Sequence, residues 1–388
     1  MLLVYYAIFI SFFKKKDYSN INLLGILIFV VTVANDILNS LEILYTGYWM
    51  HFGFTVLVII ESITISFRFS SSIEMTGELI NTLEESNKGL EELNKSLIRI
   101  NDSYGKFVPN EFLGLLSKSN ITEIKLGDQI EKEMTILFSD IRHFTDFSES
   151  LPPKATFEFL NSYLSRMGPI IRKNYGFIDK YIGDGIMALF PYSPESALIA
   201  AVEMQVALKE YNQNRIKKNY PPIEVGIGLH TGRMILGTIG ENERLDGTVI
   251  SDAVNLASRL EGLTKIYNSP ILTSMDTILE LSEPDKYTFR VLDKVRVKGK
   301  KGVVTIVEIF DGRPNFLIDL FTKTKLDFEK GVLAYYDKNF DKATFQFMKV
   351  IAINPLDTAA KLYLARTEHY SIFGVPPEWE GVVTYDIK

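Results

Sequence analysis

Long apolar runs are concentrated in the first 67 residues of this 388-residue chain, and they divide it into two parts that require different solvents. The runs at residues 21–44 and 51–67 are long enough to cross a hydrocarbon layer of about 30 Å. The run at residues 1–13 is shorter and is followed by three lysines, whereas a signal peptide carries its positive charge first. We therefore expect about three transmembrane helices within residues 1–68.

Positive charge predicts the orientation of these helices. The lysines at 14–16 and Arg68 flank alternate crossings, so both are expected on the cytoplasmic side. This places residues 45–50 outside and everything after Arg68 in the cytoplasm, as in a multi-pass protein of the inner (cytoplasmic) membrane. Asn35 and Asp36 lie within the second apolar run, where polar groups are costly. They indicate either a polar contact with another helix or a kinked or interfacial stretch.

Charge and cysteine content exclude several kinds of site. The chain has a net charge of −6 and no cysteine. An acidic balance offers no support for binding nucleic acid, and we expect no such partner. Without cysteine the chain can form neither disulfides nor thiolate zinc sites, and it has no cysteine nucleophile. This content fits a reducing compartment for the folded part.

Residues 69–106 carry a seven-residue repeat on a charged segment without proline. The d-type positions are Leu83, Leu90, Leu97 and Tyr104, and the a-type positions behind Ile80 are Asn87, Asn94 and Asn101. Leucine at d with asparagine at a is typical of a parallel two-stranded coiled coil whose register is fixed at a cost in stability. Such a coil can relay a signal between domains. A single solvated helix is the alternative.

Residues 131–312 alternate between short apolar runs and amphipathic helical segments, and residues 107–130 form a connector before them. Several consecutive strand-like runs are joined by short turns, as in hairpins. The expected elements are a strand at 134–139, helices at 156–174, 195–218 and 251–267, and hairpins at 177–190, 223–239 (through Thr231 and Gly232) and 289–310. Hairpins mixed with helices predict an α+β domain with a mixed, mostly antiparallel sheet.

Residues 315–388 have a different pattern, in which helical segments follow one another. Residues 328–336 and 340–347 predict a helix pair, and Pro355 separates it from a further helical segment at 358–370. This tail is similar to a tetratricopeptide (TPR) unit of roughly 34 residues with part of a second. Because fewer than three repeats seldom fold alone, we expect the tail to pack on the preceding domain or to bind a protein partner.

Two aspartates, Asp140 and Asp184, each end an apolar strand-like run at a turn. A carboxylate at the end of a rigid strand with apolar neighbours is costly unless a positive charge pairs with it. Two such carboxylates brought together would repel, and a divalent cation resolves that conflict. The alternative is a pair of ordinary turn aspartates, because Asp184 followed by Gly185 is also a strong hairpin signal.

Four motifs extend this pattern across the domain. They are Phe138–Thr145 (FSDIRHFT), Lys180–Ala188 (KYIGDGIMA), Gly226–Gly232 (GIGLHTG) and Val254–Leu260 (VNLASRL). Together and in this order they resemble the motifs of class III adenylate and guanylate cyclases, and the resemblance covers residues 131–311. It implies a ferredoxin-like cyclase fold and an enzyme of the phosphorus–oxygen lyase type that serves signal transduction.

The resemblance implies how metal ions and substrate are held. Two Mg²⁺ or Mn²⁺ ions per active site would bind Asp140, Asp184 and the carbonyl of Ile141. Backbone amides toward Phe144 and Thr145 would hold the triphosphate where a helix starts.

Other positions match residues that act on the reacting phosphate. Asn255 and Arg259 lie four apart on one helix and so share a face. In the family these positions orient the ribose and stabilise charge on the α-phosphate, although by themselves they fit a helix cap and a surface ion pair equally well. Lys298 matches a phosphate-binding lysine, with Lys300 as the alternative. His143 stands where the family often has a smaller residue, and we expect a solvated loop histidine there.

Two further positions bear on the choice of base. Lys180 matches the lysine that reads adenine in adenylate cyclases, where guanylate cyclases carry glutamate. Thr248 stands where many adenylate cyclases have aspartate, a bicarbonate-responsive subgroup has threonine or serine, and guanylate cyclases have cysteine. The pair favours ATP over GTP and the Lys/Thr subgroup of adenylate cyclases. In the family the metal aspartates of one subunit face the base-reading residues of the other, so the resemblance implies a homodimer with composite active sites.

The membrane part adds a second resemblance. Residues 33–38 and 49–69 resemble the last spans of seven-helix bacterial receptors with diverse intracellular signalling modules. We therefore predict a membrane-anchored, homodimeric adenylate cyclase that converts ATP to 3′,5′-cyclic AMP and pyrophosphate. The alternatives are a guanylate cyclase and a catalytically inactive cyclase-like module for dimerisation or nucleotide sensing.

Overall fold

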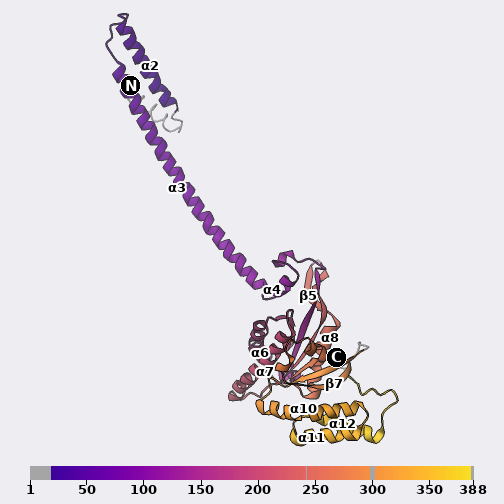
Figure 1. Ribbon diagram of the computed structural model, residues 1–388. Helices are drawn as coiled ribbons and strands as arrows, with labels where there is room; N and C mark the ends of the chain where they lie inside the picture. The colour runs from indigo at the N-terminus through magenta and orange to yellow at the C-terminus, as the bar shows by residue number, and fades with distance from the viewer. Residues whose placement is uncertain (1–18, 242, 298–301, 386–388) are drawn as a thin grey trace. The chain divides into compact units, whose positions relative to one another are not determined.

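The computed structural model describes residues 19–241, 243–297 and 302–385, and the chain divides into two units after Asp102 (Figure 1). The first apolar run, the lysines at 14–16, Lys298 and Lys300 lie outside the described residues. Each unit is described by itself.

The described residues of the first unit, 19–102, contain two helices that meet the length and composition of membrane spans. They are α2 (Ser19–Ser40) and α3 (Met50–Tyr104), with mean hydropathies of 2.2 and 1.7 in their most apolar windows. The helices approach closely at Gly53, where an added Cβ would lie 1.9 Å from Oγ1 of Thr32. Farther along, the hydroxyl of Thr64 donates to Oδ1 of Asn22 at 2.9 Å. Close packing and an interhelical hydrogen bond are the means by which helices associate in lipid.

The side chains of Asn35 and Asp36 form hydrogen bonds with the turn between these helices. The carboxylate of Asp36 accepts hydrogen bonds from the backbone N–H groups of Trp49 at 2.6 Å and Met50 at 2.8 Å, and so caps the start of α3. The side chain of Asn35 donates to the carbonyl of Gly47 at 3.0 Å. Of the two interpretations from the sequence, the structure therefore supports a polar contact with the next helix, made at its first turn.

Helix α3 continues without a break through the region of the seven-residue repeat. The d-type side chains are more than half exposed, at 54% for Leu83, 61% for Leu90, 56% for Leu97 and 52% for Tyr104. The described residues of this unit thus leave the apolar stripe without a partner, as a helix destined for a two-stranded coil would. The coiled coil itself stays a prediction.

The second unit is built on one sheet. Its described strands are β1 (Gln129–Ile141), β2 (Phe177–Ile182), β3 (Gly185–Phe190), β4 (Val225–Glu241), β5 (Arg244–Ile250), β6 (Ile271–Ser274), β7 (Phe289–Val297), β8 (Val303–Ile309) and β9 (Val383–Tyr385). Their order is β2-β3-β1-β4-β6-β8-β7-β9, with β5 paired to the second half of β4. Only the pairs β4·β6 and β7·β9 are parallel among these. The expected mixed, mostly antiparallel sheet is confirmed.

One predicted hairpin is wrong. Residues 223–239 do not turn at Thr231 and Gly232; β4 continues through them and pairs with β1 from Val225 to Gly237. The actual hairpin joins β4 to β5. The glycine at 232 serves packing instead, because a Cβ there would lie 3.1 Å from that of Ala253. At Gly228 a Cβ would lie 2.2 Å from the backbone nitrogen of Glu261, so helix and strand approach there as only glycine permits.

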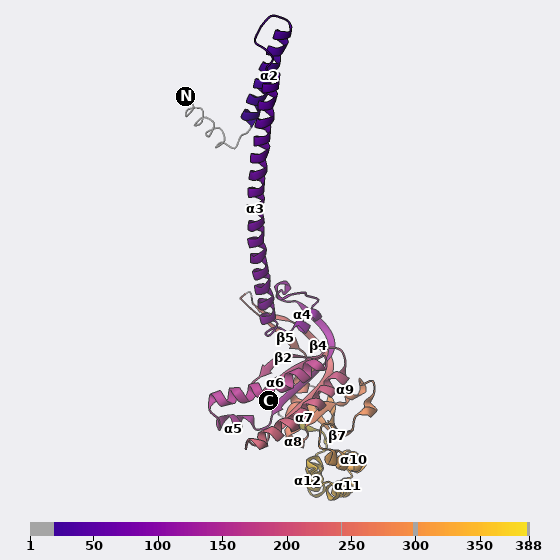
Figure 2. The ribbon, with the colours of Figure 1, turned by 90° about the vertical axis from the view of Figure 1, so that its left-hand side faces the viewer.

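Helices cover both faces of this sheet. They are α4 (Asn110–Leu115), α5 (Phe144–Glu149), α6 (Pro153–Lys173), α7 (Pro194–Lys217), α8 (Asp252–Tyr267) and α9 (Met275–Leu279), with short 3₁₀ turns at Ile121–Glu123 and Pro284–Lys286. Leu137 of β1 joins a core with α6 and α7, and its neighbour Ile136 joins a core with α4 and α8. Figures 1 and 2 show α6 and α7 together on one side of the strands. Since consecutive strand residues point to opposite faces, burial on both sides explains the continuous apolar run in β1.

The tail forms three helices that share a core with the sheet domain. They are α10 (Asn315–Tyr336), α11 (Phe340–Ile353) and α12 (Thr358–Phe373), which lie together beside β7 (Figure 1). Their buried rings Phe328, Phe347 and Tyr363 pack in one cluster with Leu260 of α8 and Leu292 of β7. Packing on the preceding domain was one of the two expectations for this tail.

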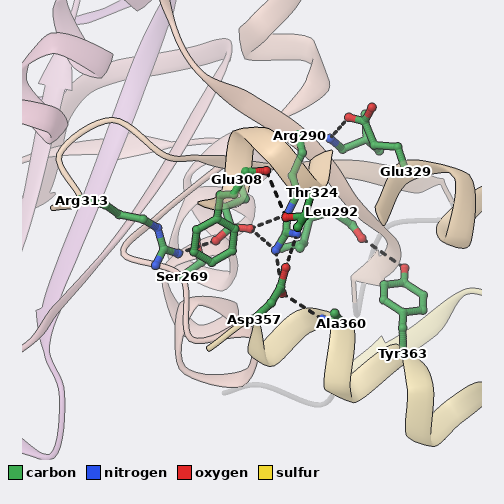
Figure 3. Close-up of polar contacts among 12 residues, drawn as sticks. Ser269, Arg290, Leu292, Glu308, Arg313, Thr324, Glu329, Asp357, Ala360 and Tyr363 are labelled. Carbon is green, nitrogen blue, oxygen red and sulfur yellow. Dashed lines mark hydrogen bonds and ion pairs between the residues drawn. The ribbon is translucent and has the colours of Figure 1, made fainter. Parts of the chain in front are cut away.

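A buried ionic network fastens the tail to the sheet (Figure 3). The guanidinium of Arg290 on β7 is 1% exposed and donates to both carboxylate oxygens of Asp357, at 2.6 and 3.0 Å. It also donates to Glu308 of β8 at 2.8 Å, and Glu308 accepts from Arg313 as well. Asp357 in turn caps α12 by accepting from the backbone N–H of Ala360 at 3.0 Å. The two arginines and two carboxylates balance in charge, which a buried network requires.

Candidate active site

The two aspartates meet where β1 ends beside the β2–β3 turn. Oδ2 of Asp184 accepts a hydrogen bond from the backbone N–H of Ile141 at 3.1 Å, which ties the turn to the end of β1. Gly183 makes the turn with a φ of +64°. A Cβ at Gly185 would lie 3.3 Å from the carbonyl oxygen of Ser139. Glycine on both sides of Asp184 therefore lets its carboxylate approach Asp140.

The carboxylate of Asp140 is close enough to Asp184 to perturb the pKa of Asp184. Burial, a hydrogen bond with Asp140 and the charge of Asp140 raise the pKa of Asp184 to about 7. Nζ of Lys265 lies 3.0 Å from Oδ2 of Asp140. The carboxylates of Asp140 and Asp184 thus attract positive charge, and the ammonium of Lys265 supplies it in this structure.

Lys265 and Glu261 are residues that sequence reasoning missed. Both lie on α8, four residues apart. Burial, followed by the charge of Asp140, raises the pKa of Glu261 to about 7. Their spacing is that of an ordinary surface ion pair on a helix, so the sequence gives no sign that they approach Asp140 and Asp184.

Arg142 is a third missed residue, and it holds the loop after β1. Its guanidinium donates to Glu224 at 2.9 Å, to Asn268 at 2.6 Å, and to the carbonyls of Thr264 at 2.9 Å and Ser269 at 3.0 Å. Three of these four acceptors belong to the end of α8 and the turn after it. The loop that follows Asp140 is therefore fixed to the helix that carries Lys265.

A cavity of about 550 Å³ opens at this point. The residues lining it are Asp140, Ile141, Arg142, His143, Phe144, Thr145, Asp146, Asp184, Glu224, Lys265 and Asn268. Among them are the three residues predicted to bind metal, Asp140, Ile141 and Asp184, and the two predicted to hold the triphosphate where a helix starts, Phe144 and Thr145. His143 is 87% exposed and adopts a left-handed conformation with φ of 56° just before α5, as expected for a solvated loop residue.

The remaining predicted site residues do not line this cavity. Lys180 lies on β2, Thr248 lies on β5 opposite Gly237, and Asn255 and Arg259 lie on α8. Asn255 is exposed, whereas Leu256 and Leu260 on the same helix are buried. Among the described residues of one chain, those predicted to bind metal and triphosphate therefore lie apart from those predicted to bind the base, the ribose and the α-phosphate. Lys298 lies outside the described residues.

Comparisons with known proteins identify the kind of domain that contains this cavity. The family model for the adenylate and guanylate cyclase catalytic domain matches residues 127–308. The chain is 43% identical to an adenylate cyclase of Anabaena cylindrica over 62% of its own length and 49% of that protein. It is 37% identical to the terminal-differentiation specific adenylate cyclase of Dictyostelium discoideum over 67% of its length and 12% of that protein.

A solved structure supports the fold. A bacterial light-regulated adenylyl cyclase matches with a TM-score of 0.51 and 23% identity, over 61% of this chain and 69% of that one. The chain spans about half the length of its Anabaena relative and a smaller part of the Dictyostelium one. The match over residues 127–308 identifies this segment as a catalytic domain of the adenylate and guanylate cyclase family.

Proposed function

We propose that this protein is a membrane-anchored, homodimeric adenylate cyclase that converts ATP to 3′,5′-cyclic AMP and pyrophosphate. The observation that carries the proposal is the pair Asp140 and Asp184 in a cavity that contains the phosphate-loop residues but none of the base-reading ones. In the reaction a bond forms between the ribose 3′-oxygen and the α-phosphorus. The bond from that phosphorus to the β-phosphate oxygen breaks, and pyrophosphate leaves.

The residues at the aspartate pair fit a divalent cation. The pKa of one of the two adjacent carboxyls, that of Asp184, is raised to about 7, and the Lys265 ammonium lies 3.0 Å from Oδ2 of the other, Asp140. The described residues contain no cluster of three or more His, Cys, Asp or Glu side chains for a metal. This suits Mg²⁺ or Mn²⁺, which complete their coordination with water and substrate phosphates. Asp140, Asp184 and the carbonyl of Ile141 would hold two such ions, which activate the attacking hydroxyl and neutralise the leaving group.

The chain's other residues would bind and orient the nucleotide from a second copy. In one chain Asn255 points away from the buried side of α8, so it is free to face a partner. Asn255 of that copy would orient the ribose, and Arg259 would stabilise charge on the α-phosphate through its fixed guanidinium fork. Lys180 and Thr248 would hold the adenine. Phe144 and Thr145 of the first chain would hold the triphosphate.

The first unit supplies the anchor and the dimer contact in this proposal. The exposed leucine stripe of α3 would pair in parallel with that of a second copy, and the asparagines at a would fix its register. Helices α2 and α3 would cross the cytoplasmic membrane and leave the catalytic domain in the cytoplasm. The TPR-like tail remains a candidate surface for a protein partner.

The direct test uses the full chain in lipid vesicles. We expect cyclic AMP from ATP in the presence of Mg²⁺ or Mn²⁺, with much less cyclic GMP from GTP, measured by chromatography of the products. A folded dimer that forms neither product would instead support a nucleotide-sensing module. Predominant cyclic GMP would support a guanylate cyclase.

Base choice gives a sharper prediction. The double variant Lys180→Glu with Thr248→Cys is expected to shift the ratio of kcat/KM for ATP over GTP toward GTP by about 10²-fold or more, because hydrogen-bond donors and acceptors at the base are exchanged. Competing ATP and GTP in one reaction measures the ratio directly. A folded variant with the wild-type ratio would show that these positions do not read the base.

A further inference from the structure

A β-bulge precedes the predicted base-reading lysine. In the pairing of β2 with β3, Ile178 lies opposite Ala188 and Lys180 lies opposite Met187, so Asp179 is an extra residue with no partner of its own. Consecutive side chains of a regular strand point to opposite faces. Here the extra residue breaks that alternation, and Oδ2 of Asp179 lies 3.4 Å from Nζ of Lys180. Bulges of this kind re-aim side chains next to active sites.

The Asp179 carboxylate lies in an unfavourable environment. Its side chain is only 4% exposed, while that of Lys180 is 38% exposed. Oδ2 is shielded from solvent, and beyond the Lys180 ammonium at 3.4 Å no donor meets it among the described residues. Burial, and then the charge of Asp246, raise the pKa of this carboxyl, and Lys180 opposes the shift. A buried carboxylate that meets its cation only at this distance costs stability, so its presence calls for a role other than stability.

We propose that Asp179 is a positioning residue that holds the ammonium of Lys180 in place and so sharpens the discrimination between adenine and guanine. The proposal deepens the function proposed above and rests on Lys180 reading the base. It follows from three observations: the bulge that puts the two side chains together, their distance of 3.4 Å, and the near-complete burial of the carboxylate.

The chemistry explains why a fixed ammonium matters. Adenine presents an acceptor at N1, which an ammonium can donate to, whereas guanine presents an N–H donor there. A lysine head on four rotatable bonds can avoid an unfavourable donor by moving away. An ammonium held by a buried carboxylate cannot move as freely, so the mismatch with guanine is retained. The charge of Asp246 on β5 also acts on Asp179, and Asp246 is two residues before Thr248, the other residue predicted to bind the base.

The test replaces Asp179 in the full chain and measures nucleotide discrimination. Asp179→Asn and Asp179→Ala are expected to lower the ratio of kcat/KM for ATP over GTP by about tenfold, mainly through a higher KM for ATP. The midpoint of thermal unfolding should stay the same or rise, because a buried charge with an unmet acceptor is removed. A purely structural ion pair would show the opposite: a lower midpoint with an unchanged ratio.

The matched control is Asp246→Asn, which removes an equal charge from the same neighbourhood outside the bulge. This control should keep the wild-type ratio of kcat/KM for ATP over GTP. Equal effects from both substitutions would overturn the proposal, because any nearby negative charge would then act in the same way. If the wild-type chain forms no cyclic product, the proposed function fails separately. The role of Asp179 is then tested by the binding of the α,β-methylene analogues of ATP and GTP. If the wild type prefers the ATP analogue and Asp179→Asn does not, the role is supported. If the wild type and the variant show the same preference, or neither shows one, the role is refuted.

Discussion

Replacing Asp140 with asparagine is expected to lower the rate of cyclic AMP formation by about 10²- to 10³-fold. The substitution keeps the shape of the side chain and removes the negative charge that would hold a divalent cation. The fold should survive, because this side chain is 30% exposed and its ion-pair partner, Lys265, is 48% exposed. Initial rates with ATP and either metal, together with the thermal midpoint, measure both effects. Glu149→Gln, on exposed α5, removes a nearby charge as a control and should leave the rate unchanged.

Mixing variants tests the composite arrangement directly. Asn255→Ala alone should also be inactive. In a dimer of one Asn255→Ala chain and one Asp140→Asn chain, however, one active site carries both defects and the other carries neither. Random pairing at equal concentrations should therefore restore about a quarter of wild-type activity. Co-expressed chains with two different affinity tags allow the mixed dimer to be purified and assayed. Mixed dimers as inactive as the single variants would rule out sites shared between subunits.

Replacing Arg290 with methionine is expected to reduce the free energy of unfolding of the catalytic unit by about 3–5 kcal/mol. The substitution strands the carboxylate of Asp357, which is fully buried at the start of α12, without its cation. Thermal or urea unfolding followed by tryptophan fluorescence measures the loss, since Trp379 packs against the tail helices. The control Arg296→Met breaks an exposed pair with Glu380, with side chains 41% and 61% exposed, and should cost less than about 1 kcal/mol.

A second substitution separates the cost of the stranded charge from the other costs of losing this ion pair. Adding Asp357→Leu to Arg290→Met removes the stranded carboxylate and should recover part of the lost stability, because apolar replacement of buried ion pairs is often tolerated. Glu308 keeps its contact with Arg313 in both variants. If the double variant were less stable than Arg290→Met alone, the loss would come from the start of α12, where Asp357 also accepts a hydrogen bond from the backbone N–H of Ala360 at 3.0 Å.

Local patterns predicted much of the second unit. The apolar run at 134–139 predicted β1, Asp184 followed by Gly185 predicted the β2–β3 hairpin, and Ser251 before an amphipathic stretch agrees with its observed role as the N-cap of α8. These features depend on neighbours within a few residues, so the sequence contains the information directly. The motif order likewise predicted that Asp140 and Asp184 would meet.

The errors and omissions have a different origin. Thr231 and Gly232 look like a turn, but their conformation is set by pairing with β1, about 100 residues earlier, and by the close approach of α8. Glu261, Lys265 and Arg142 look like surface charges because their partners lie on other elements. Asp179 was missed for a similar reason: its burial and the bulge emerge only when β2 pairs with β3. Contacts between distant segments decide all of these positions.

The shared core beneath α8 determines where the second unit can be divided. Leu256, Leu260, Leu263 and Tyr267 bury one side of this helix in a core to which β6, β7, β8 and rings of the tail all contribute. A fragment ending after β8 would uncover the part of that core that the tail closes, at a cost of roughly 1.5–3 kcal/mol for each large apolar side chain uncovered. The unit that folds cooperatively thus extends to the end of α12, well beyond the last residue that matches the cyclase family. The helix carrying Asn255 and Arg259 therefore owes part of its packing to the tail as well as to the sheet.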